Sequence, residues 1–338
     1  MFGCGTALSA GRELAAAGIE RAIILCTRSG EALANRIAAS APAHVADVVM
    51  PAHPDITAED YERLIGLARQ KEAGGFIAMG GGTPIGLAKA ISATTPLRYL
   101  AIPTTYSGSE MARTWHYGKG KEGRKGASFA ALPVTALYDP ELTLTLPARV
   151  SAQSGMNAMA HAVESLYGAD RSPVVETLAE AAVRGLAASL PRVVARPDDI
   201  DARTDAFYAA WLAAAFRAEV GVEHALAQRL RDRFNLSHAG AHTVVTPYAI
   251  AFNRQAAKPA MEAIGRALGV TDAGLGLYEL NVRLGNPTGL KDLGMKASAI
   301  EAGADHVMAS PIVNPRPVSR ADLVELITQA FHGAAPCF

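Results

Sequence analysis

Hydrophobic residues in the first 150 positions form short runs that alternate with longer stretches of mixed polarity. The runs are AIILC at 22–26, VADVVM at 45–50, FIAM at 76–79 and YLAI at 99–102. The segments between them that are typical of helices are 7–17, 31–39 and 58–71. Short apolar strands that alternate with helices indicate a parallel sheet covered on both faces. The sequence therefore predicts an α/β domain with a doubly wound, mostly parallel sheet over residues 1–150.

The pattern changes after Pro147 to long, alanine-rich stretches with few β-branched runs. Helices are predicted over 152–167, 173–190, 204–216, 223–233, 258–268 and 320–331. The change follows the turn-like sequence Tyr138-Asp139-Pro140 and falls at a Leu-Pro step, which is typical of a domain boundary. We therefore expect an all-helical catalytic domain over residues 151–338.

The amino-acid composition limits the kinds of molecule that this chain is expected to bind. The chain has 338 residues, with 32 basic against 32 acidic side chains, so its charge balance does not favour nucleic acid. It contains no apolar run of membrane-spanning length, and three separated cysteines do not suggest a disulfide framework. We expect a cytoplasmic protein that binds a small-molecule substrate, and neither nucleic acid nor a membrane.

A glycine run follows the third predicted strand. The sequence FIAMGGGTPIGLAKAIS passes through Gly80, Gly81 and Gly82 into a predicted helix with Pro84 near its first turn. Glycines let a ligand approach the backbone closely, and a helix start offers unpaired N–H groups and a partial positive charge. The run predicts a pyrophosphate-binding loop; the alternative is a tight turn without a ligand.

Small hydroxyl side chains follow the fourth predicted strand, in AIPTTYSGSE. The carboxyl ends of parallel strands meet at one edge of a sheet, so Thr104, Thr105 and Ser109 are expected to face the glycine run. Their hydroxyls can donate hydrogen bonds to phosphate oxygens. Either loop alone would be unremarkable as a turn; the pair predicts a dinucleotide site.

Histidines gather in the second half. Asn157 and His161 are four residues apart on one predicted helix and so share a face, and His224, His238 and His242 follow in VEHALAQRLRDRFNLSHAGAH. Imidazole is a common metal ligand, so His161, His224 and His238 could converge on a cation. The alternative is that each histidine is structural.

With these motifs in place, the chain resembles the iron-containing (group III) alcohol dehydrogenase family, in its maleylacetate reductase branch. The matching runs are GGGTPIGLAKAI, AIPTTYSGSEM, LYDPELTLTLP, SGMNAMAHAVE and FNLSHAGAHTVV. The resemblance implies a dehydroquinate synthase-like fold, a homodimer, and a nicotinamide cofactor, NADPH or NADH. The residues of this chain that match the family's cofactor-binding positions are Gly80, Gly81, Gly82, Thr83, Thr104, Thr105 and Ser109.

The resemblance also implies a reaction without a metal ion. Metal-dependent relatives bind iron or zinc at positions that correspond to Asn157, His161, His224 and His238. Asn157 replaces an aspartate, as in the reductase branch, which removes the anionic ligand and lowers the expected affinity for a divalent cation. A three-histidine zinc site is the alternative.

Other positions depart from the reductase branch. Gln228 stands where the branch has a proton-relaying histidine, and an amide is no general acid near neutral pH. Glu223 and Ala225 replace a histidine and a lysine. Tyr248 replaces a histidine after a proline. Maleylacetate itself is therefore not assured as the substrate.

These observations support a function hypothesis and two alternatives. The hypothesis is an NAD(P)H-dependent reductase of a small polar carbonyl or conjugated substrate, with the reacting carbon near His161, His224, His238 and His242 and with Tyr248 or His242 as the proton donor. The first alternative is a redox-neutral elimination, cyclisation or condensation on the same scaffold. The second is a degenerate homologue without catalysis.

The end of the strand predicted at 22–26 bears on cofactor choice. A carboxylate there would bind the ribose hydroxyls of NAD, whereas Thr27 and Arg28 offer a hydroxyl and a cation that allow a 2′-phosphate. NADPH is therefore allowed. His116 and Lys125 lie in a glycine- and lysine-rich segment and are further candidates for the substrate pocket.

Overall fold

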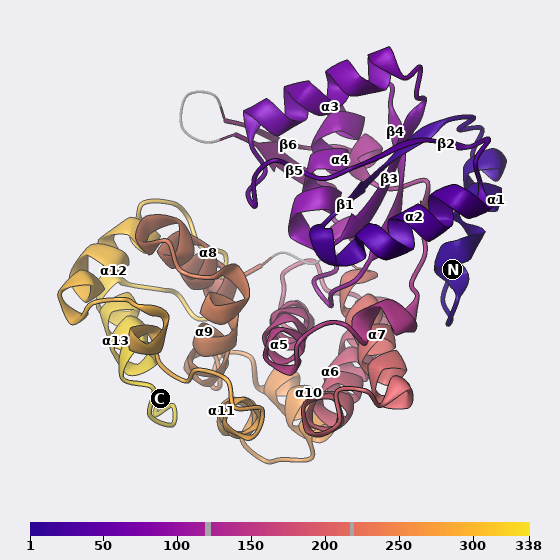
Figure 1. Cartoon of the computed structure of the whole chain (residues 1–338). Helices are drawn as coiled ribbons and strands as arrows, with labels where there is room; N and C mark the ends of the chain where they lie inside the picture. Colours follow the sequence, from indigo (N-terminus) through magenta and orange to yellow (C-terminus); the bar gives the residue numbers. More distant parts are fainter. Residues whose placement is uncertain (119–122, 217–219) are drawn as a thin grey trace. The chain divides into compact units, whose positions relative to one another are not determined.

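The structure is a computed structural model that describes residues 1–118, 123–216 and 220–338. These residues divide into two compact units, Met1–Leu146 and Pro147–Phe338, which we describe one at a time (Figure 1).

The first unit is built on a five-stranded sheet in the order β2-β1-β3-β4-β7, with every described pair parallel. Its strands are β1 (Ala22–Cys26), β2 (Val45–Val49), β3 (Gly75–Gly80), β4 (Arg98–Pro103) and β7 (Thr135–Ala136). The register pairs Met79 with Ile102 and Gly80 with Pro103, so β3 and β4 end side by side. The loops that follow these two strands therefore leave the sheet at one edge.

Helices cover both faces of this sheet, which confirms the predicted fold class (Figure 1). They are α1 (Ala10–Ala16), α2 (Glu31–Ser40), α3 (Ala58–Gln70) and α4 (Gly82–Thr94). Successive strand residues alternate between two cores: Ile23 packs with residues of α3 and α4, and Ile24 packs with residues of α1 and α2. A strand buried on both faces needs apolar residues at consecutive positions, which is why AIILC is uninterrupted.

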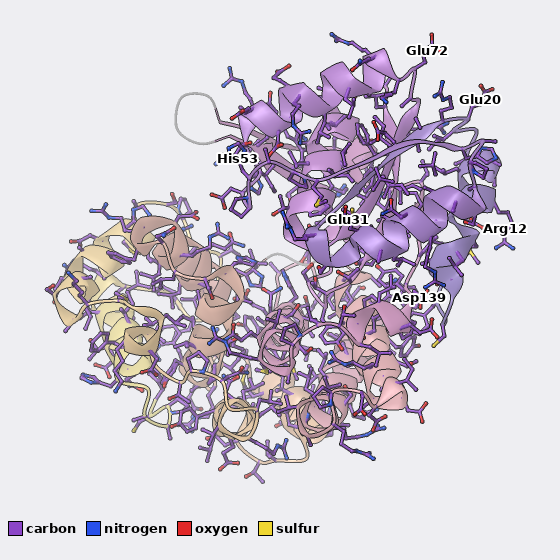
Figure 2. The ribbon with its side chains drawn as sticks, viewed as in Figure 1. Arg12, Glu20, Glu31, His53, Glu72 and Asp139 are labelled. Carbon is purple, nitrogen blue, oxygen red and sulfur yellow. The ribbon has the colours of Figure 1, made fainter. Side chains whose placement is uncertain are left out.

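The amino terminus is tied to the strand edge near β7. The Met1 ammonium donates to Ala136 O at 2.7 Å, and Phe2 forms an isolated parallel bridge with Tyr138. The buried Asp139, labelled in Figure 2, accepts from the N–H groups of Gly5 and Ala7, each at 3.1 Å. These contacts hold residues 1–7 against the sheet edge.

The segment that contains His116 and Lys125 is a hairpin. Strands β5 (Thr114–Tyr117) and β6 (Arg124–Ala127) pair antiparallel, with His116 opposite Lys125. Residues 119–122, which join the two strands, lie outside the described residues. The role of both side chains in a substrate pocket stays a prediction.

The second unit is helical throughout its described part. Its helices are α5 (Ala148–Ser165), α6 (Pro173–Ala195), α7 (Ile200–Ala214), α8 (Val222–Phe234), α9 (His238–Phe252), α10 (Lys258–Leu268), α11 (Ala273–Arg283), α12 (Ile300–Met308) and α13 (Arg320–His332). Helix α5 packs against α6, α7 and α9 and is buried along most of its length. Within the described residues, no helix is both long and apolar enough to cross a membrane.

Three of these helices, α9, α11 and α12, are absent from the sequence prediction. Helix α9 is buried on nearly all sides, so its residues show no polar face, and Pro247 interrupts its hydrogen bonding. A helix without a polar face lacks the periodicity on which such a prediction rests.

Candidate active site

The glycine run joins β3 to α4 in the first unit. Gly80 has φ +143°, a conformation that favours glycine, and Gly81 caps α4 without a side-chain hydrogen bond. A Cβ atom on Gly82 would meet nothing within 4 Å, so the space over this residue is open. The start of α4 therefore presents backbone N–H groups to an open space, which suits the phosphates of a dinucleotide.

The second loop lies against the first. The Thr104 N–H donates to Gly80 O at 3.1 Å, and the Thr105 methyl carbon lies 3.1 Å from where a Cβ on Gly81 would be. Thr27 flanks the same run, because its methyl carbon is 3.6 Å from a Cβ position on Gly80. The structure thus brings Thr27 and Thr105 to the glycine run; the sequence predicts this position for Thr105 but not for Thr27.

Other predicted cofactor residues have their hydrogen-bonding groups engaged elsewhere or lie further out. The Thr83 hydroxyl donates to Pro54 O, and Ser109 is held by its backbone carbonyl, which accepts from Lys89 Nζ at 2.8 Å. Arg28 is exposed. Whether these side chains contact a cofactor stays a prediction.

In the second unit, three helices bring the predicted histidines together. His161 lies on α5, His224 in the first turn of α8, and His238 and His242 on α9. The Nε2 atom of His224 is 3.0 Å from Nδ1 of His161. The ring centres of His224 and His242 are 4.7 Å apart, and those of His238 and His242 are 4.8 Å apart.

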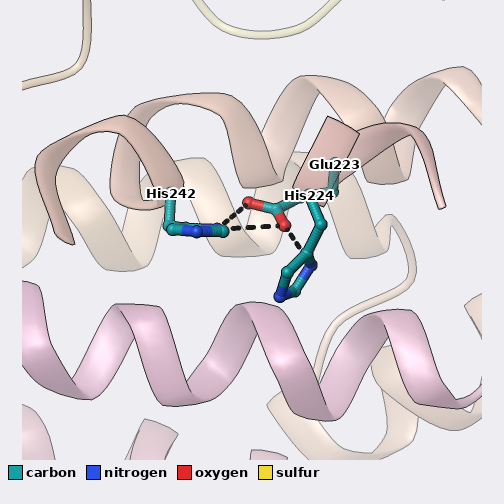
Figure 3. A group of neighbouring side chains, drawn as sticks. All are labelled: Glu223, His224 and His242. Carbon is teal, nitrogen blue, oxygen red and sulfur yellow. Dashed lines mark hydrogen bonds and ion pairs between the residues drawn. The ribbon is translucent and has the colours of Figure 1, made fainter. Parts of the chain in front are cut away.

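Two buried carboxylates complete this group, which we call the histidine–glutamate cluster (His161, Glu164, Glu223, His224 and His242). His224 Nδ1 donates to Glu164 Oε2 at 2.6 Å and lies 2.7 Å from Glu223 Oε2. His242 Nδ1 donates to Glu223 Oε1 at 2.9 Å, so Glu223 lies between the two imidazoles (Figure 3). Glu164, Glu223, His224 and His242 are each at most 1 % exposed.

The start of α8 explains why Glu164 points at this cluster. Gly221 caps the helix without a side chain, and Glu164 Oε1 accepts from the Glu223 N–H at 2.9 Å and from the Tyr167 hydroxyl at 3.3 Å. A carboxylate is favoured at a helix N-terminus. A Cβ on Gly221 would lie 2.9 Å from Glu164 Oε1, so this close approach requires glycine.

The two carboxylates set the charge of His224. Burial alone would lower the pKa of His224, but the charges of Glu223 and Glu164 outweigh it and raise the pKa to about 10. Burial alone would raise the pKa of Glu223, but His242 and His224 outweigh it and hold that pKa well below its ordinary range. His224 is therefore an imidazolium near neutral pH.

An imidazolium at His224 fixes the tautomer of His161. Because Nδ1 of His224 faces carboxylates, its Nε2–H donates to Nδ1 of His161. Neutral His161 then carries its own proton on Nε2. The pair forms a hydrogen-bonded path from the carboxylates to His161.

His238 is set apart from this path. A guanidinium only donates, so Nδ1 of His238 accepts from Arg231 at 2.6 Å. Loss of hydration, together with the charges of His242 and Arg231, lowers the pKa of His238. The residue is the first of α9, at the exposed start of an otherwise buried helix, and its Nδ1 is already engaged.

The structure does not bring Tyr248 into the cluster. Its side chain is buried in the core with residues of α8, α12 and α13, and its hydroxyl donates to Ala334 O at 2.7 Å. Burial raises the pKa of Tyr248 above its ordinary value, so it is a poor acid. We therefore withdraw Tyr248 as a proton donor. Gln228 is exposed on α8, one turn after His224.

Three buried polar atoms of this unit have no hydrogen-bond partner within the described part of the chain, and two of them, Asn157 Oδ1 and His242 Nε2, belong to predicted site residues. Asn157 is 3 % exposed and precedes His161 by one turn of α5, on the same face. Buried polar atoms are rarely left unpaired, so both atoms are available to a polar group of a ligand or to water.

Sequence reasoning recognised the histidines but not the carboxylates. The sequence assigns no role to Glu164, and Glu223 stands there only as a replacement for a histidine. A signal for Glu164 is present in SGMNAMAHAVE: it is an acidic residue that follows His161 by one turn in an otherwise apolar stretch. Only the approach of α8 to α5 gives it a partner.

One group among the described residues has its ligand-type atoms close enough to hold a metal ion: Glu223, His224 and His242. It differs from the predicted set of His161, His224 and His238. Its atoms lie at hydrogen-bond distances, with 2.7 Å between His224 Nδ1 and Glu223 Oε2. Two ligands on a tetrahedral cation at about 2.0–2.1 Å would lie further apart, so the distances seen here are those of hydrogen bonds between the side chains.

Comparison with known proteins places both units in one family. The model of iron-containing alcohol dehydrogenases matches residues 1–140, and the C-terminal model of the Fe-containing alcohol dehydrogenase family matches residues 151–331. A maleylacetate reductase of Burkholderia cepacia is 42 % identical over 340 residues, covering 99 % of this chain and 96 % of the relative. One of Sphingobium indicum is 39 % identical over the same length and coverage. The crystal structure of maleylacetate reductase from Agrobacterium tumefaciens superposes with a TM-score of 0.95 at 33 % identity, covering 99 % of this chain and 96 % of that one.

Proposed function

The chain belongs to the iron-containing alcohol dehydrogenase family, in its maleylacetate reductase branch, and we propose that it reduces a small polar carbonyl or conjugated substrate without a bound metal ion. It is an NAD(P)-dependent oxidoreductase. The observation that carries the proposal is the contact of His224 with two carboxylates at one nitrogen and with His161 at the other.

The glycine run is the proposed place of the cofactor. Gly82 leaves the backbone at the start of α4 open, and Thr105 borders the run at Gly81. These features fit the phosphates of a nicotinamide dinucleotide, which, when bound in its reduced form, supplies a hydride. The residues of the loop bind and orient it.

The histidine–glutamate cluster supplies the proton. His161 donates its Nε2 proton to the substrate oxygen (or to the carbon of a conjugated bond) as the hydride arrives. The Nε2 proton of His224 then moves to Nδ1 of His161, along the 3.0 Å contact. His224 becomes neutral and keeps its Nδ1 proton toward Glu164. Solvent then restores the lost proton.

A cation is not needed in this scheme, because the imidazolium of His224 already places a positive charge in the cluster. Several features support a reaction without metal: Asn157 is no anionic ligand, the contacts of His224 have hydrogen-bond lengths, and a cation, Arg231, donates to His238. Positive neighbours and protonated ligands both oppose binding of a divalent cation.

The test of this proposal uses protein freed of metal with a chelator and checked by elemental mass spectrometry. With NADPH or NADH and a panel of keto acids, aldehydes and maleylacetate, we expect substrate-dependent loss of nicotinamide absorbance that added Fe²⁺ or Zn²⁺ does not increase. Activity that returns only with metal would overturn metal independence. Product formed without net NAD(P)H oxidation would instead favour a redox-neutral reaction.

The charge of His224 predicts the pH dependence of turnover. Its folded pKa of about 10 lies above the ordinary 6.5, so the imidazolium persists across neutral pH and is lost as the pH rises through about 10. We expect kcat to stay level from about pH 7 to 9 and to fall above that range. The same shift stabilises the fold at low pH, and that contribution declines as the pH rises from about 6.5 toward 10.

The variant Glu223→Gln removes one of the two charges that hold this proton. Its alkaline fall in kcat is therefore expected at lower pH than in the wild type, as measured from full pH–rate profiles. Glu279→Gln, an exposed change on α11, serves as the control and should leave the profile unchanged. An unmoved profile in Glu223→Gln would contradict the assigned role of the carboxylates.

We further propose that NADPH is accepted at least as well as NADH. Arg28 is exposed just beyond β1, next to Thr27, where a cation can pair with a 2′-phosphate. Arg28→Glu is expected to weaken NADPH binding by about tenfold or more and to leave NADH binding within about threefold, since one charge pair near a surface is replaced by repulsion. Equal losses for the two cofactors, measured by titration of nicotinamide fluorescence, would contradict this.

A further inference from the structure

A buried lysine and a buried glutamate lie in the first unit and have no part in the chemistry described above. Lys89, on α4, is 4 % exposed, and Glu110, just after the 104–109 loop, is 1 % exposed. Burial of a charged side chain is costly, so such residues are rarely kept without a partner or a task.

The contacts of both residues converge on one end of the 104–109 loop. Lys89 Nζ donates to Ser109 O at 2.8 Å. Glu110 Oε1 accepts from the Tyr138 hydroxyl at 2.7 Å, and Tyr138 is in turn held by the amino-terminal residues Met1 and Gly3 through its backbone. The loop end is thus fixed to α4 on one side and to the strand edge on the other.

The opposite end of the loop is bonded to the glycine run. Thr104 N–H donates to Gly80 O at 3.1 Å, and Thr105 packs against Gly81. Lys89 follows Gly82 by seven residues, about two helical turns, so it lies on the same side of α4 as the helix start. The loop is therefore attached at one end to the glycine run and at the other to Lys89, about two turns into α4.

The charges of Lys89 and Glu110 are consistent with a role in holding the 104–109 loop in place. Burial raises the pKa of Glu110, while hydrogen bonds, including that from Tyr138, and the charge of Lys89 oppose the rise. Glu110 Oε2 has no hydrogen-bond partner in the described part of the chain, so its carboxylate is held by Tyr138 and by attraction to Lys89. An interaction of this kind is sensitive to the loss of either charge.

We propose that Lys89 and Glu110 are positioning residues of the dinucleotide site, which hold the 104–109 loop against α4 so that Thr105 stays beside Gly81. The proposal rests on the assignment of the glycine run to the cofactor. It extends that assignment to a pair of residues that do not touch the cofactor themselves.

The test measures the dissociation constants of NADPH and NADH for Lys89→Met, Lys89→Arg and Glu110→Gln, with folding checked by circular dichroism and thermal melting. Lys89→Met is expected to raise the cofactor dissociation constant by about tenfold or more, the loss typical of a buried hydrogen bond from a charged donor. Glu110→Gln should raise it less, because an amide oxygen can still accept from Tyr138. Lys89→Arg, which keeps the charge and a donor, should recover most of the affinity.

A purely structural role would lower the melting temperature without this pattern. The cofactor KM should therefore rise in Lys89→Met while the substrate KM and kcat at saturating cofactor stay within about twofold, a split expected when only binding is lost. Lys71→Met, a change of the same kind at a half-exposed position at the end of α3, is the control and should bind the cofactor normally.

Two results would overturn the proposal. The first is a folded Lys89→Met protein with wild-type cofactor affinity, and the second is failure of Lys89→Arg to do better than Lys89→Met. If Gly81→Asp also leaves cofactor binding unchanged, the fault lies with the assignment of the glycine run. If Gly81→Asp abolishes binding while Lys89→Met does not, only the positioning role fails.

Discussion

Gly81→Asp is expected to abolish dinucleotide binding while leaving the protein folded. Gly81 caps α4, and aspartate is among the best capping residues, so the new carboxylate would accept hydrogen bonds from the free N–H groups at the helix start. It would thereby occupy the groups offered to the phosphates and repel their charge. We expect the dissociation constant for NADPH and NADH to rise by about 100-fold or more, the scale of a like-charge contact near a protein surface.

Two variants separate charge from bulk in this experiment. Gly81→Ala adds only a Cβ, 3.1 Å from the Thr105 methyl carbon, and should weaken binding far less. Gly66→Asp adds the same charge at an exposed position of α3 with nothing within 4 Å of its Cβ, and should not affect binding. Unchanged cofactor affinity in Gly81→Asp, measured by calorimetry, would remove the glycine run from the cofactor site.

His161→Asn is expected to reduce kcat by about 10²- to 10⁴-fold, the usual contribution of a positioned general acid. An amide can replace some hydrogen bonds of the ring but cannot give up a proton near neutral pH. We assign NADPH to the first unit, and the substitution removes no contact of that site. The dissociation constant of NADPH should therefore stay within about twofold of the wild-type value. Stopped-flow measurement of NADPH oxidation would separate the chemical step from product release.

Variants of the neighbouring histidines test whether the proton passes through His161. If His224 acts only through His161, the double variant His161→Asn with His224→Gln should be no slower than the slower single variant, since residues that act as a unit are not additive. His238→Asn should cost less than about tenfold, because Nδ1 of His238 already accepts from Arg231 and lies off the path. A loss in His238→Asn as large as that in His161→Asn would contradict this path and assign the proton donor to His238, at the exposed start of α9.

The sheet and the loops at its edge could be predicted because their determinants are local. Residues 22–26 are apolar without interruption, and the structure forms β1 over Ala22–Cys26, buried on both faces. Gly81 follows β3 directly and Thr104 follows β4 directly, so parallel pairing of these strands brings their loops together. The resemblance to a family adds the nature of the ligand, which strand order alone does not specify.

The chemistry of the cluster could not be predicted in the same way. Glu164 is separated from His224 by 60 residues, and Glu223 accepts from His242, 19 residues later. No local pattern reports such contacts, because they depend on how α5, α8 and α9 pack. In the sequence Glu223 is only a departure from the histidine of the reductase branch, whereas the structure gives this carboxylate two imidazole partners.

Tyr248 shows the opposite error. It follows Pro247 in the sequence at a position where the reductase branch has a histidine, which suggested an acid. On α9 it lies six residues after His242, so it points to a different side of the helix and enters the core. A residue that can donate a proton is evidence for a catalytic role only once the direction of its side chain is known.

The measurement that tests the central claim most directly is the protonation state of His224. The account predicts that nitrogen-15 NMR of histidine-labelled protein, with His224→Gln used to assign the signal, will show both ring nitrogens of His224 protonated from about pH 6.5 to 9. It further predicts loss of one proton near pH 10. A neutral His224 ring at pH 7.5, in folded protein free of metal, would contradict the proposed proton path from the carboxylates to His161.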